Sequence, residues 1–394
     1  MPHIEGIRIQ NYRSLKDITL GKTSKNWNAE PLPQLITIIG TNGCGKSTLI
    51  DALAFLGDCL AEGVKAACDK PHRGGIERLL TRGQDNSIQF EIYYRQNDSS
   101  NCRGYYLCIG KDKTEQPYIV HEYLGETIKY IETNAFFLSL KKGHGDVNIG
   151  EDRLDVSLTD HQRLGISTFG NLASYPHIVA FREFLESWYL ADFIPNLGHH
   201  LTLMGAHKHL ARDGHNLANY AHYLRHYYPS RFEKVLRDLT QDIPNIDKIT
   251  IKVTEDNRLL LQFIDNHYTT PFYVQEISDG ILKFFAYLLL LQDPEPAALI
   301  GIEELENGLH HHLVESLALE MKQVTQNIYG PQILLTTHAP YLIDTLMPEE
   351  VWIMKKNERG FSTIERAVDI QVLKDLSTKR KNFWYTYYVK QGQL

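Results

Sequence analysis

Apolar and polar residues alternate along several segments of the chain. Alternation with a period of two is typical of strands that bury one face and expose the other. The segment 248–265 shows this pattern on both sides of Glu255-Asp256-Asn257, a turn-forming triplet, and so predicts a hairpin. The other alternating segments are 6–20, 87–94, 103–110 and 118–124.

Three shorter runs, at 35–40, 298–302 and 332–337, are almost entirely apolar. Short continuous apolar runs are typical of strands buried on both faces of a parallel sheet. Each run is followed by helix-compatible sequence, so the core is predicted to be α/β. No helical pattern is long enough for a coiled-coil arm. The main helical patterns between the runs lie at 174–193, 216–228 and 230–243.

Composition narrows the class of protein. The 394 residues carry 41 Lys and Arg against 48 Asp and Glu, a formal net charge of −7. This balance excludes a uniformly basic protein that coats nucleic acid, while a local basic patch stays compatible with it. Hydrophobic residues make up 43%, which supplies a sizeable core and excludes disorder as the main state.

The five cysteines contain no Cys-x-x-Cys pair, which favours a reducing compartment. The first residues lack the charged and apolar regions of a signal peptide. The longest apolar run, 284–291, is much shorter than the roughly 20 residues that cross a bilayer. The sequence therefore predicts a cytoplasmic protein without a membrane segment.

A phosphate-binding loop is the clearest chemical motif. Residues 40–48 match G-x-x-x-x-G-K-[ST] in full, after a predicted strand and before a predicted helix. Glycines let backbone N–H groups turn toward phosphates at a helix N-terminus. Lys46 is expected to reach the β- and γ-phosphates from a solvent-open loop, and Ser47 to ligate Mg²⁺. The residues expected to surround the nucleotide are Asn42, Gly43, Cys44, Gly45, Lys46, Ser47 and Thr48.

Two further buried strands end in polar residues. The run 298–302 leads into Glu303 and Glu304, and the run 332–337 leads into His338. Carboxylates at the end of a central strand near a phosphate loop suit Mg²⁺ coordination and water activation. Glu303 is expected to lie beside the metal ion and to help hold it. Glu304 is the expected general base, and His338 is a group that could polarise or sense a γ-phosphate.

A third element is Ser278-Asp279-Gly280, which precedes the helical run 281–291. Serine and glycine at a helix start make an anion site, although alone they are more often a simple cap. We call this triplet the signature-like segment. It lies between the phosphate loop and the acidic pair.

The order and spacing of these motifs resemble the ATP-binding-cassette (ABC) ATPases. More narrowly, the chain resembles the bacterial RecF-like and SMC-like (structural maintenance of chromosomes) ATPases of the AAA family, over most of residues 1–355. Leu305, His311, Ile281 and Lys283 depart from residues common in that family, and Glu303 stands in place of the more general Walker-B aspartate. The matching pieces are 9–15, 40–48, 213–218, 277–283, 302–310 and 337–340.

The resemblance implies a fold and a site. It implies an ABC-type head with an antiparallel β lobe, a mainly parallel core sheet and a helical insertion. It also implies that ATP and Mg²⁺ are the cofactors, that Arg13 contacts the nucleotide, and that Ser278 and Gly280 bind the γ-phosphate held by a second protomer.

The same resemblance implies slow ATP hydrolysis coupled to head-to-head dimerisation or a higher oligomer. It further implies regulation of a separately encoded, nuclease-like effector in anti-phage defence. A DNA-repair or DNA-end-processing ATPase that binds nucleic acid, and a non-hydrolysing scaffold clamped by ATP, remain alternatives. A transporter subunit is disfavoured because Ser278 lies 232 positions after Lys46, a much longer separation than in transporter subunits.

We expect one head built from four segments. These are an N-terminal β lobe (1–140), a mainly helical insertion (141–245), a C-terminal lobe (246–355) and a tail (356–394). The histidines between 199 and 226 suggest solvent- or partner-facing positions more than a zinc site, because no ligand-like spacing accompanies them. Basic and aromatic residues at 379–390 suit a partner, a nucleic acid, or simple packing on the core.

Overall fold

The computed structural model divides the chain into two compact units. Among the described residues, unit 1 comprises 1–188 and 348–370, and unit 2 comprises 189–347. The predicted segment boundaries lay after residues 140, 245 and 355, whereas the contacts divide the chain after 188 and 347. The basic aromatic segment 379–390, and His199 and His200, lie outside the described residues. These are 1–84, 87–97, 99–126, 136–150, 152–194, 198, 202–205, 207–343 and 345–370.

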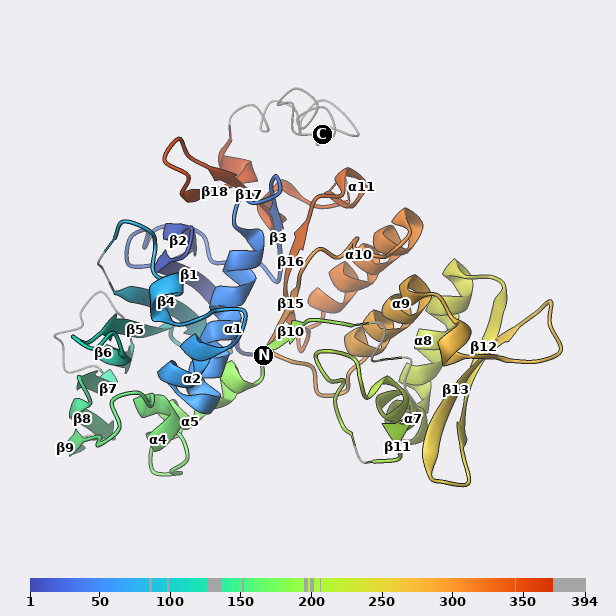
Figure 1. The fold of residues 1–394 in the computed structure, drawn as a ribbon, viewed down its shortest axis with the longest axis horizontal. Coiled ribbons are helices and arrows are strands. Elements are labelled where there is room, and N and C mark those ends of the chain that lie inside the picture. The colour runs from blue at the N-terminus through green and yellow to red at the C-terminus, as the bar shows by residue number, and fades with distance from the viewer. Residues whose placement is uncertain are drawn as a thin grey trace. The chain divides into compact units, whose positions relative to one another are not determined.

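Unit 1 is built on an antiparallel sheet (Figure 1), in the order β2-β1-β4-β5-β6-β7-β8-β9. Every neighbouring pair is antiparallel, so the strands predicted from alternation are confirmed. The strands are β1 (His3–Tyr12), β2 (Leu15–Gly21), β4 (Ile88–Arg95), β5 (Arg103–Lys111), β6 (Pro117–Gly125), β7 (Phe136–Lys141), β8 (His144–Ile149) and β9 (Asp152–Ser157).

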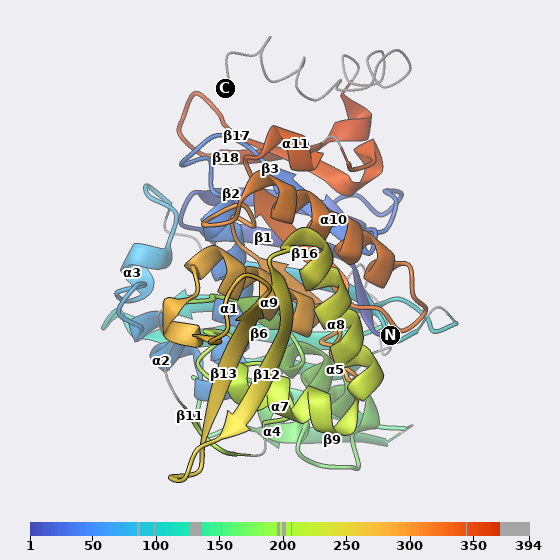
Figure 2. The same ribbon diagram turned by 90° about the vertical axis from the view of Figure 1, so that its right-hand side faces the viewer.

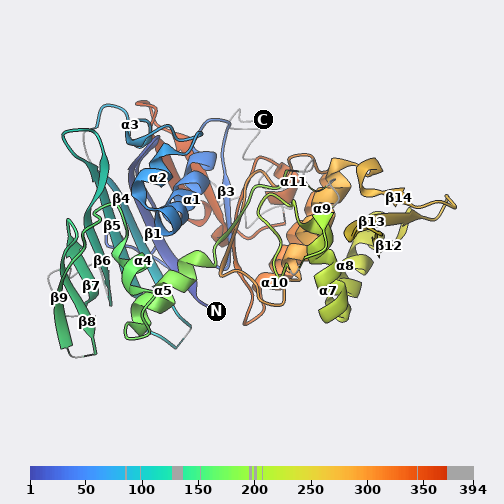
Figure 3. The ribbon, with the colours of Figure 1, turned by 60° about the horizontal axis from the view of Figure 1, so that its bottom comes forward.

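Helices cover one face of this sheet (Figure 3). The longest, α1, buries an apolar stripe that includes Leu49, Leu53 and Phe55, and the Phe55 ring stacks on Phe90 of β4 at 6.1 Å. The stripe follows the helical period of 3.6 residues, which explains why this segment is helical and which face it buries. The helices are α1 (Lys46–Glu62), α2 (Val64–Asp69), α3 (Ile76–Leu79), α4 (Gly165–Phe169) and α5 (Pro176–Glu186).

The predicted helix at 174–193 is wrong at its C-terminal end. Helix α5 begins at Pro176, where the missing N–H costs nothing, and ends at Glu186. Tyr189–Ala191 then forms strand β10, which pairs in parallel with β15 (Leu299–Ile302). Ladder hydrogen bonds to a buried neighbouring strand outweigh the local helical pattern there.

The three apolar runs are strands, as predicted. In unit 1, β3 (Leu35–Ile39) pairs in parallel with β17 (Val351–Lys356), which pairs with β18 (Ser362–Arg366). In unit 2, β15 pairs in parallel with β16 (Gln332–Thr337). Every residue of β3, β15 and β16 is buried, in agreement with the two-sided burial that the runs predicted.

Unit 2 also contains a helical layer and the predicted hairpin (Figure 2). Strands β12 and β13 pair antiparallel, and α7 and α8 pack against them. Its helices are α7 (Leu217–Tyr227), α8 (Pro229–Asp242), α9 (Asp279–Leu291), α10 (His311–Thr325) and α11 (Pro340–Ile343). Its small sheet comprises β11 (Thr202–Leu203), β12 (Ile246–Val253), β13 (Arg258–Asp265) and β14 (Phe272–Tyr273).

A buried carboxylate links α4 to the sheet of unit 1. Glu122 of β6 is 1% exposed and accepts hydrogen bonds from the N–H groups of Gly165 at 2.5 Å and Ile166 at 3.1 Å, and from the Tyr105 hydroxyl at 3.1 Å. Burial disfavours the charged form and raises the pKa of Glu122 to about 7, although these three hydrogen bonds act in the opposite direction.

Glu122 therefore makes unit 1 less stable as the pH rises. Between an unfolded pKa of 4.5 and a folded pKa of about 7, the folded state holds a proton that the unfolded state has lost, so stability falls across this window. Glutamine carries no ionisable proton but offers one acceptor oxygen in place of two, so we expect Glu122→Gln to melt below the wild type at pH 5 and to lose much of that difference by pH 8. Between pH 5 and pH 8, the ionisation of Glu122 changes the free energy of unfolding by at most about 3 kcal/mol. The same difference in melting temperature between Glu122→Gln and the wild type at both pH values would contradict this expectation.

No helix among the described residues is long and apolar enough to cross a membrane.

Candidate functional site

The phosphate loop lies in unit 1, between β3 and α1. Gly40, Gly43 and Gly45 have φ values of 159°, 75° and 117°. The last two lie in the left-handed region that favours glycine. At Gly45 a side chain is also excluded by space, since a Cβ atom there would lie 2.3 Å from the hydroxyl oxygen of Ser362. The backbone thus has the tight turn and close approach that a phosphate cradle requires.

Lys46 is folded back onto this loop. Its ammonium group donates to the carbonyl oxygens of Gly40 at 2.8 Å and Thr41 at 3.3 Å, and the residue is 5% exposed. The expectation of a solvent-open lysine is therefore wrong, because the backbone carbonyls of the loop surround the ammonium group. Ser47, one position later, is exposed at the start of α1, where its hydroxyl is accessible to a ligand.

The other residues predicted for the loop differ in their exposure to solvent. Asn42 and Gly43 are exposed at its tip, Thr48 is half-buried, and Cys44 is 1% exposed. Burial raises the pKa of the Cys44 thiol, so this sulfur is a neutral packing group beneath the loop. Cys44 therefore contributes its backbone to the loop.

Arg13 is held against α1. Its guanidinium lies 3.0 Å from the Asp51 carboxylate and donates to the carbonyl oxygen of His72 at 2.8 Å. The backbone at Arg13 has a φ of 49°, an uncommon value for a residue with a side chain. Asp51 also accepts from the Tyr12 hydroxyl at 2.7 Å and from Arg73 at 2.9 Å. Arg13 is thus a member of an ionic network on the helix that follows the phosphate loop.

The acidic pair lies in unit 2, directly after β15. Glu303 and Glu304 are both half-buried, and Glu304 has a φ of 44°. The N–H of Glu304 donates to the hydroxyl oxygen of Thr336 at 2.9 Å, and the N–H of Leu305 donates to the Thr336 carbonyl at 3.3 Å. The neighbouring strand β16 therefore holds the turn and sets the uncommon backbone conformation at Glu304.

His338 meets Glu304 at the ends of these two strands. His338 Nε2 lies 3.1 Å from Glu304 Oε1. Glu306 positions this histidine, because its carboxylate accepts from the His338 N–H at 2.5 Å and from the Thr337 hydroxyl at 2.8 Å. Two residues that lie 34 positions apart are thereby brought within hydrogen-bond distance, in the arrangement of a carboxylate base oriented by an imidazole.

The signature-like segment begins α9, which lies beside this turn. Ser278 is the N-cap of the helix, and its hydroxyl oxygen accepts from the N–H of Ile281 at 3.4 Å. Gly280 is required by space, since a Cβ atom there would lie 2.6 Å from the carbonyl oxygen of Gly308. The segment is therefore both a helix cap and a close neighbour of the turn that carries Glu304.

Two family models match the chain. One, described as an AAA ATPase domain, matches residues 3–156, and the other, described as "AAA domain, putative AbiEii toxin, Type IV TA system", matches residues 149–344. The first region includes the phosphate loop, and the second includes the signature-like segment, the acidic pair and His338. No curated protein matches the chain.

Solved structures of Smc heads share the fold. A head bound to the C-winged helix domain of ScpA has a TM-score of 0.54 at 13% identity, with 92% of this chain and 97% of that chain covered. A head with an extended coiled coil, bound to the C-terminal domain of ScpA derived from Pyrococcus furiosus, has a TM-score of 0.52 at 12% identity, with 93% and 96% covered. The chain is therefore similar to AAA ATPase domains over two consecutive regions and has the fold of the Smc heads. The predicted resemblance and the predicted fold class are confirmed.

The chain carries its predicted site residues in two sets. Unit 1 holds Arg13 and the phosphate loop with Ser47, and unit 2 holds Glu303, Glu304, His338 and the signature-like segment. Unit 2 brings Glu304, His338 and Gly280 to one turn. The assignment of Ser47 and Glu303 to Mg²⁺ spans both sets and stays a prediction.

Three residues that support the candidate site were missed by sequence reasoning. Ser362 donates its hydroxyl to the carbonyl oxygen of Cys44 at 2.6 Å, from a strand 318 positions further along the chain, so no local pattern indicates it. Thr336 and Thr337 hold Glu304 and Glu306. A signal for them existed, since two hydroxyl residues at the end of a buried strand need partners.

Several of the described histidines between 202 and 226 make ring contacts and ion pairs. No group of three or more His, Cys, Asp or Glu in the part of the chain that the structure describes could hold a metal ion. His222 and His226 stack one turn apart on α7 with ring centroids separated by 6.3 Å, and His209 lies 3.1 Å from Asp293. The assignment of the whole cluster stays a prediction.

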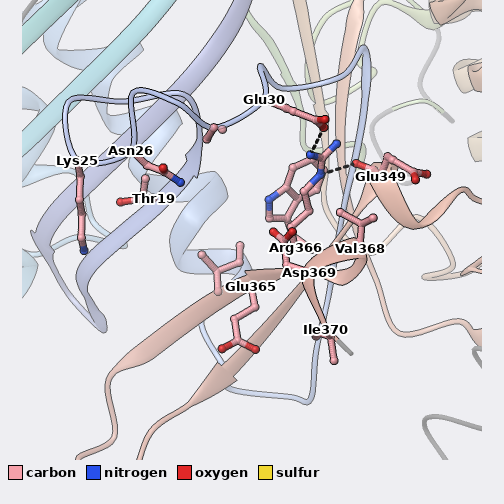
Figure 4. Close-up of a pocket in the computed structure, with 14 residues that line it drawn as sticks. Thr19, Lys25, Asn26, Glu30, Glu349, Glu365, Arg366, Val368, Asp369 and Ile370 are labelled. Carbon is pink, nitrogen blue, oxygen red and sulfur yellow. Dashed lines mark hydrogen bonds and ion pairs between the residues drawn. The ribbon is translucent and has the colours of Figure 1, made fainter. Parts of the chain in front are cut away.

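A separate cavity of about 940 Å³ in unit 1 lies beside β18 (Figure 4). Arg366 projects into it, lies 2.6 Å from Glu30, donates to the carbonyl oxygen of Glu349 at 3.2 Å and stacks over the Trp352 ring. None of the residues predicted for the nucleotide site lines this cavity. Arg366 is paired within the cavity, and the cavity is separate from the predicted nucleotide site.

Proposed function

We propose that this chain binds and slowly hydrolyses ATP in a head-to-head dimer, with Mg²⁺ as cofactor. The observation that carries the proposal is the phosphate loop, in which left-handed glycines turn the backbone and Lys46 sits inside the turn. The family models support an ATPase over both sets of site residues. On binding, the ammonium group would exchange backbone carbonyls for phosphate oxygens, a stronger charge-assisted pairing.

In this proposal Glu304 is the general base. Its carboxylate would take a proton from the attacking water, while His338 would orient this carboxylate. His338 is also proposed to polarise or sense the γ-phosphate. Ser47 and Glu303 would hold Mg²⁺, which would neutralise charge on the phosphate oxygens. Arg13 is proposed to contact the nucleotide from the turn between β1 and β2, where it pairs with Asp51 of α1.

Ser278 and Gly280 are proposed to act on ATP held by the partner subunit. Their place at the start of a 13-residue helix supplies N–H groups and a favourable dipole for an anion. Each active site of the dimer would then combine the phosphate loop and Glu304 of one subunit with the signature-like segment of its partner.

A mixture of two inactive variants tests this composite site. Lys46→Ala is expected to lose most of its affinity for ATP, and Ser278→Arg is expected to bind ATP without hydrolysing it. Mixed in equal amounts, they should regain hydrolysis, because each mixed dimer holds one complete site. The control is each variant alone at the same total concentration. Normal hydrolysis by Ser278→Arg alone would contradict a composite site and leave the segment as a helix cap.

We further propose that ATP-dependent dimerisation regulates a separately encoded, nuclease-like effector in anti-phage defence. One matching family model is described as a putative toxin of a type IV toxin–antitoxin system, which supports a role beside a partner protein. Plating efficiency of phage on cells carrying the gene with its neighbours tests the proposal. Protection by the wild type and its loss in Lys46→Ala is the expected result, and equal plating would contradict it.

A further inference from the structure

Helix α9 carries one buried charge among apolar residues. Of its 13 residues, ten are buried, and Lys283 is the charged one among those ten. Its pKa is lowered by burial, against an opposing effect of Glu306 and Glu304. Burying an ammonium group is costly unless it is paired and hydrogen-bonded, so this lysine needs a structural or functional reason.

The Lys283 side chain reaches the turn that carries Glu304. Its Nζ donates to the carbonyl oxygen of Asn307 at 2.7 Å. Asn307 in turn donates two hydrogen bonds to Glu304. Its N–H donates to the Glu304 carbonyl at 2.8 Å, and its side-chain amide donates to Glu304 Oε2 at 3.4 Å. A continuous chain of contacts therefore runs from α9 through Asn307 to Glu304 and His338.

A second contact joins the same two elements. Gly280 packs so closely on Gly308 that no side chain fits between α9 and the turn. The helix start and the turn are thus fixed at two points, one steric and one hydrogen-bonded. A turn with a strained residue such as Glu304, at a φ of 44°, keeps its conformation only where its surroundings determine it.

We infer that Lys283 is a positioning residue that holds the Glu304 turn in the same subunit for ATP hydrolysis. The inference rests on the proposed function, in which Glu304 is the general base. Loss of this contact would let Glu304 relax away from His338 while the phosphate loop stays intact. A displacement of about 1 Å at a reacting group lowers a rate by about 100-fold.

Single variants give the first test. We expect Lys283→Met to bind ATP like the wild type and to hydrolyse it in a single turnover about 10- to 100-fold more slowly. Lys283→Arg, which can still donate to the Asn307 carbonyl, should recover most of the rate. Lys322→Met is the matched control, since Lys322 of α10 also donates to a backbone carbonyl, that of Thr345. Thermal melting of all three variants reports whether the fold is kept.

The mixed dimers give the decisive test. Ser278→Arg supplies the phosphate loop and Glu304 of the one complete site, whereas Lys46→Ala supplies its signature-like segment. Adding Lys283→Met to the Ser278→Arg chain should remove the regained hydrolysis. Adding it to the Lys46→Ala chain should leave most of that hydrolysis.

The opposite pattern would overturn the inference, because it would mean that Lys283 serves Ser278 rather than Glu304. Equal losses in both arrangements, or a lower melting temperature with no recovery by Lys283→Arg, would also overturn it and indicate a purely structural lysine. Failure of the proposed function is distinguishable, since the mixture without any Lys283 substitution would then show no hydrolysis.

Discussion

Lys46→Ala is expected to lower the affinity for ATP by about 100-fold or more, because the ammonium group contributes charge-assisted hydrogen bonds to phosphate oxygens. The structure shows this group already inside the loop, on the carbonyls of Gly40 and Thr41. Equilibrium binding of a fluorescent ATP analogue, with unlabelled ATP as competitor, measures the change.

Burial of Lys46 calls for a control on the fold. Lys46→Met keeps the aliphatic stem that fills the loop and loses only the charge, so it should bind ATP as weakly as Lys46→Ala with a smaller loss of stability. Lys65→Ala, at an exposed position on α2 of the same unit, should bind normally. Wild-type affinity in Lys46→Met would contradict the phosphate-loop assignment.

Glu304→Gln is expected to bind ATP and to hydrolyse it about 10²- to 10⁴-fold more slowly, the usual contribution of a positioned general base. Glutamine keeps the shape of the side chain and an oxygen that can face His338, but it cannot accept the proton. The backbone contacts of the turn to Thr336 are unaffected by the change. Single-turnover hydrolysis at saturating ATP isolates the chemical step from binding.

Neighbouring carboxylates serve as controls for this variant. Glu315→Gln on α10 is expected to hydrolyse ATP normally, because this residue lies outside the turn. Glu303→Gln should lower the apparent affinity for Mg²⁺ more than it lowers the maximal rate, in keeping with its proposed role beside the metal. Unchanged hydrolysis in Glu304→Gln would exclude Glu304 as the base and leave Glu303 and Glu306 as the candidates.

Local patterns were sufficient for most of the architecture. The alternating and apolar runs indicated strands correctly because burial on one or two faces is recorded in the period of the side chains. The phosphate loop was equally visible, since its glycines and lysine are consecutive. The end of α5 was not predictable in this way, because the strand at Tyr189–Ala191 forms only where β15 offers it a partner.

Contacts between distant residues account for what the sequence left open. Glu304 and His338 were each predicted at the end of a buried strand, but their contact and the role of Glu306 in holding His338 depend on the exact turn between them. Ser362 reaches Cys44 across 318 positions, and burial of Lys46 results from the fold of the loop rather than from its composition. Such contacts follow from tertiary packing, which one sequence does not record.

Sedimentation of Glu304→Gln with and without ATP and Mg²⁺ tests the proposed function most directly. Trapped ATP should hold two heads together, so the variant is expected to sediment as a monomer without nucleotide and as a dimer with it. Adding Lys46→Met or Ser278→Arg to the same chain should abolish the dimer. A chain that keeps one molecular weight under all these conditions would contradict a composite, ATP-bridged site.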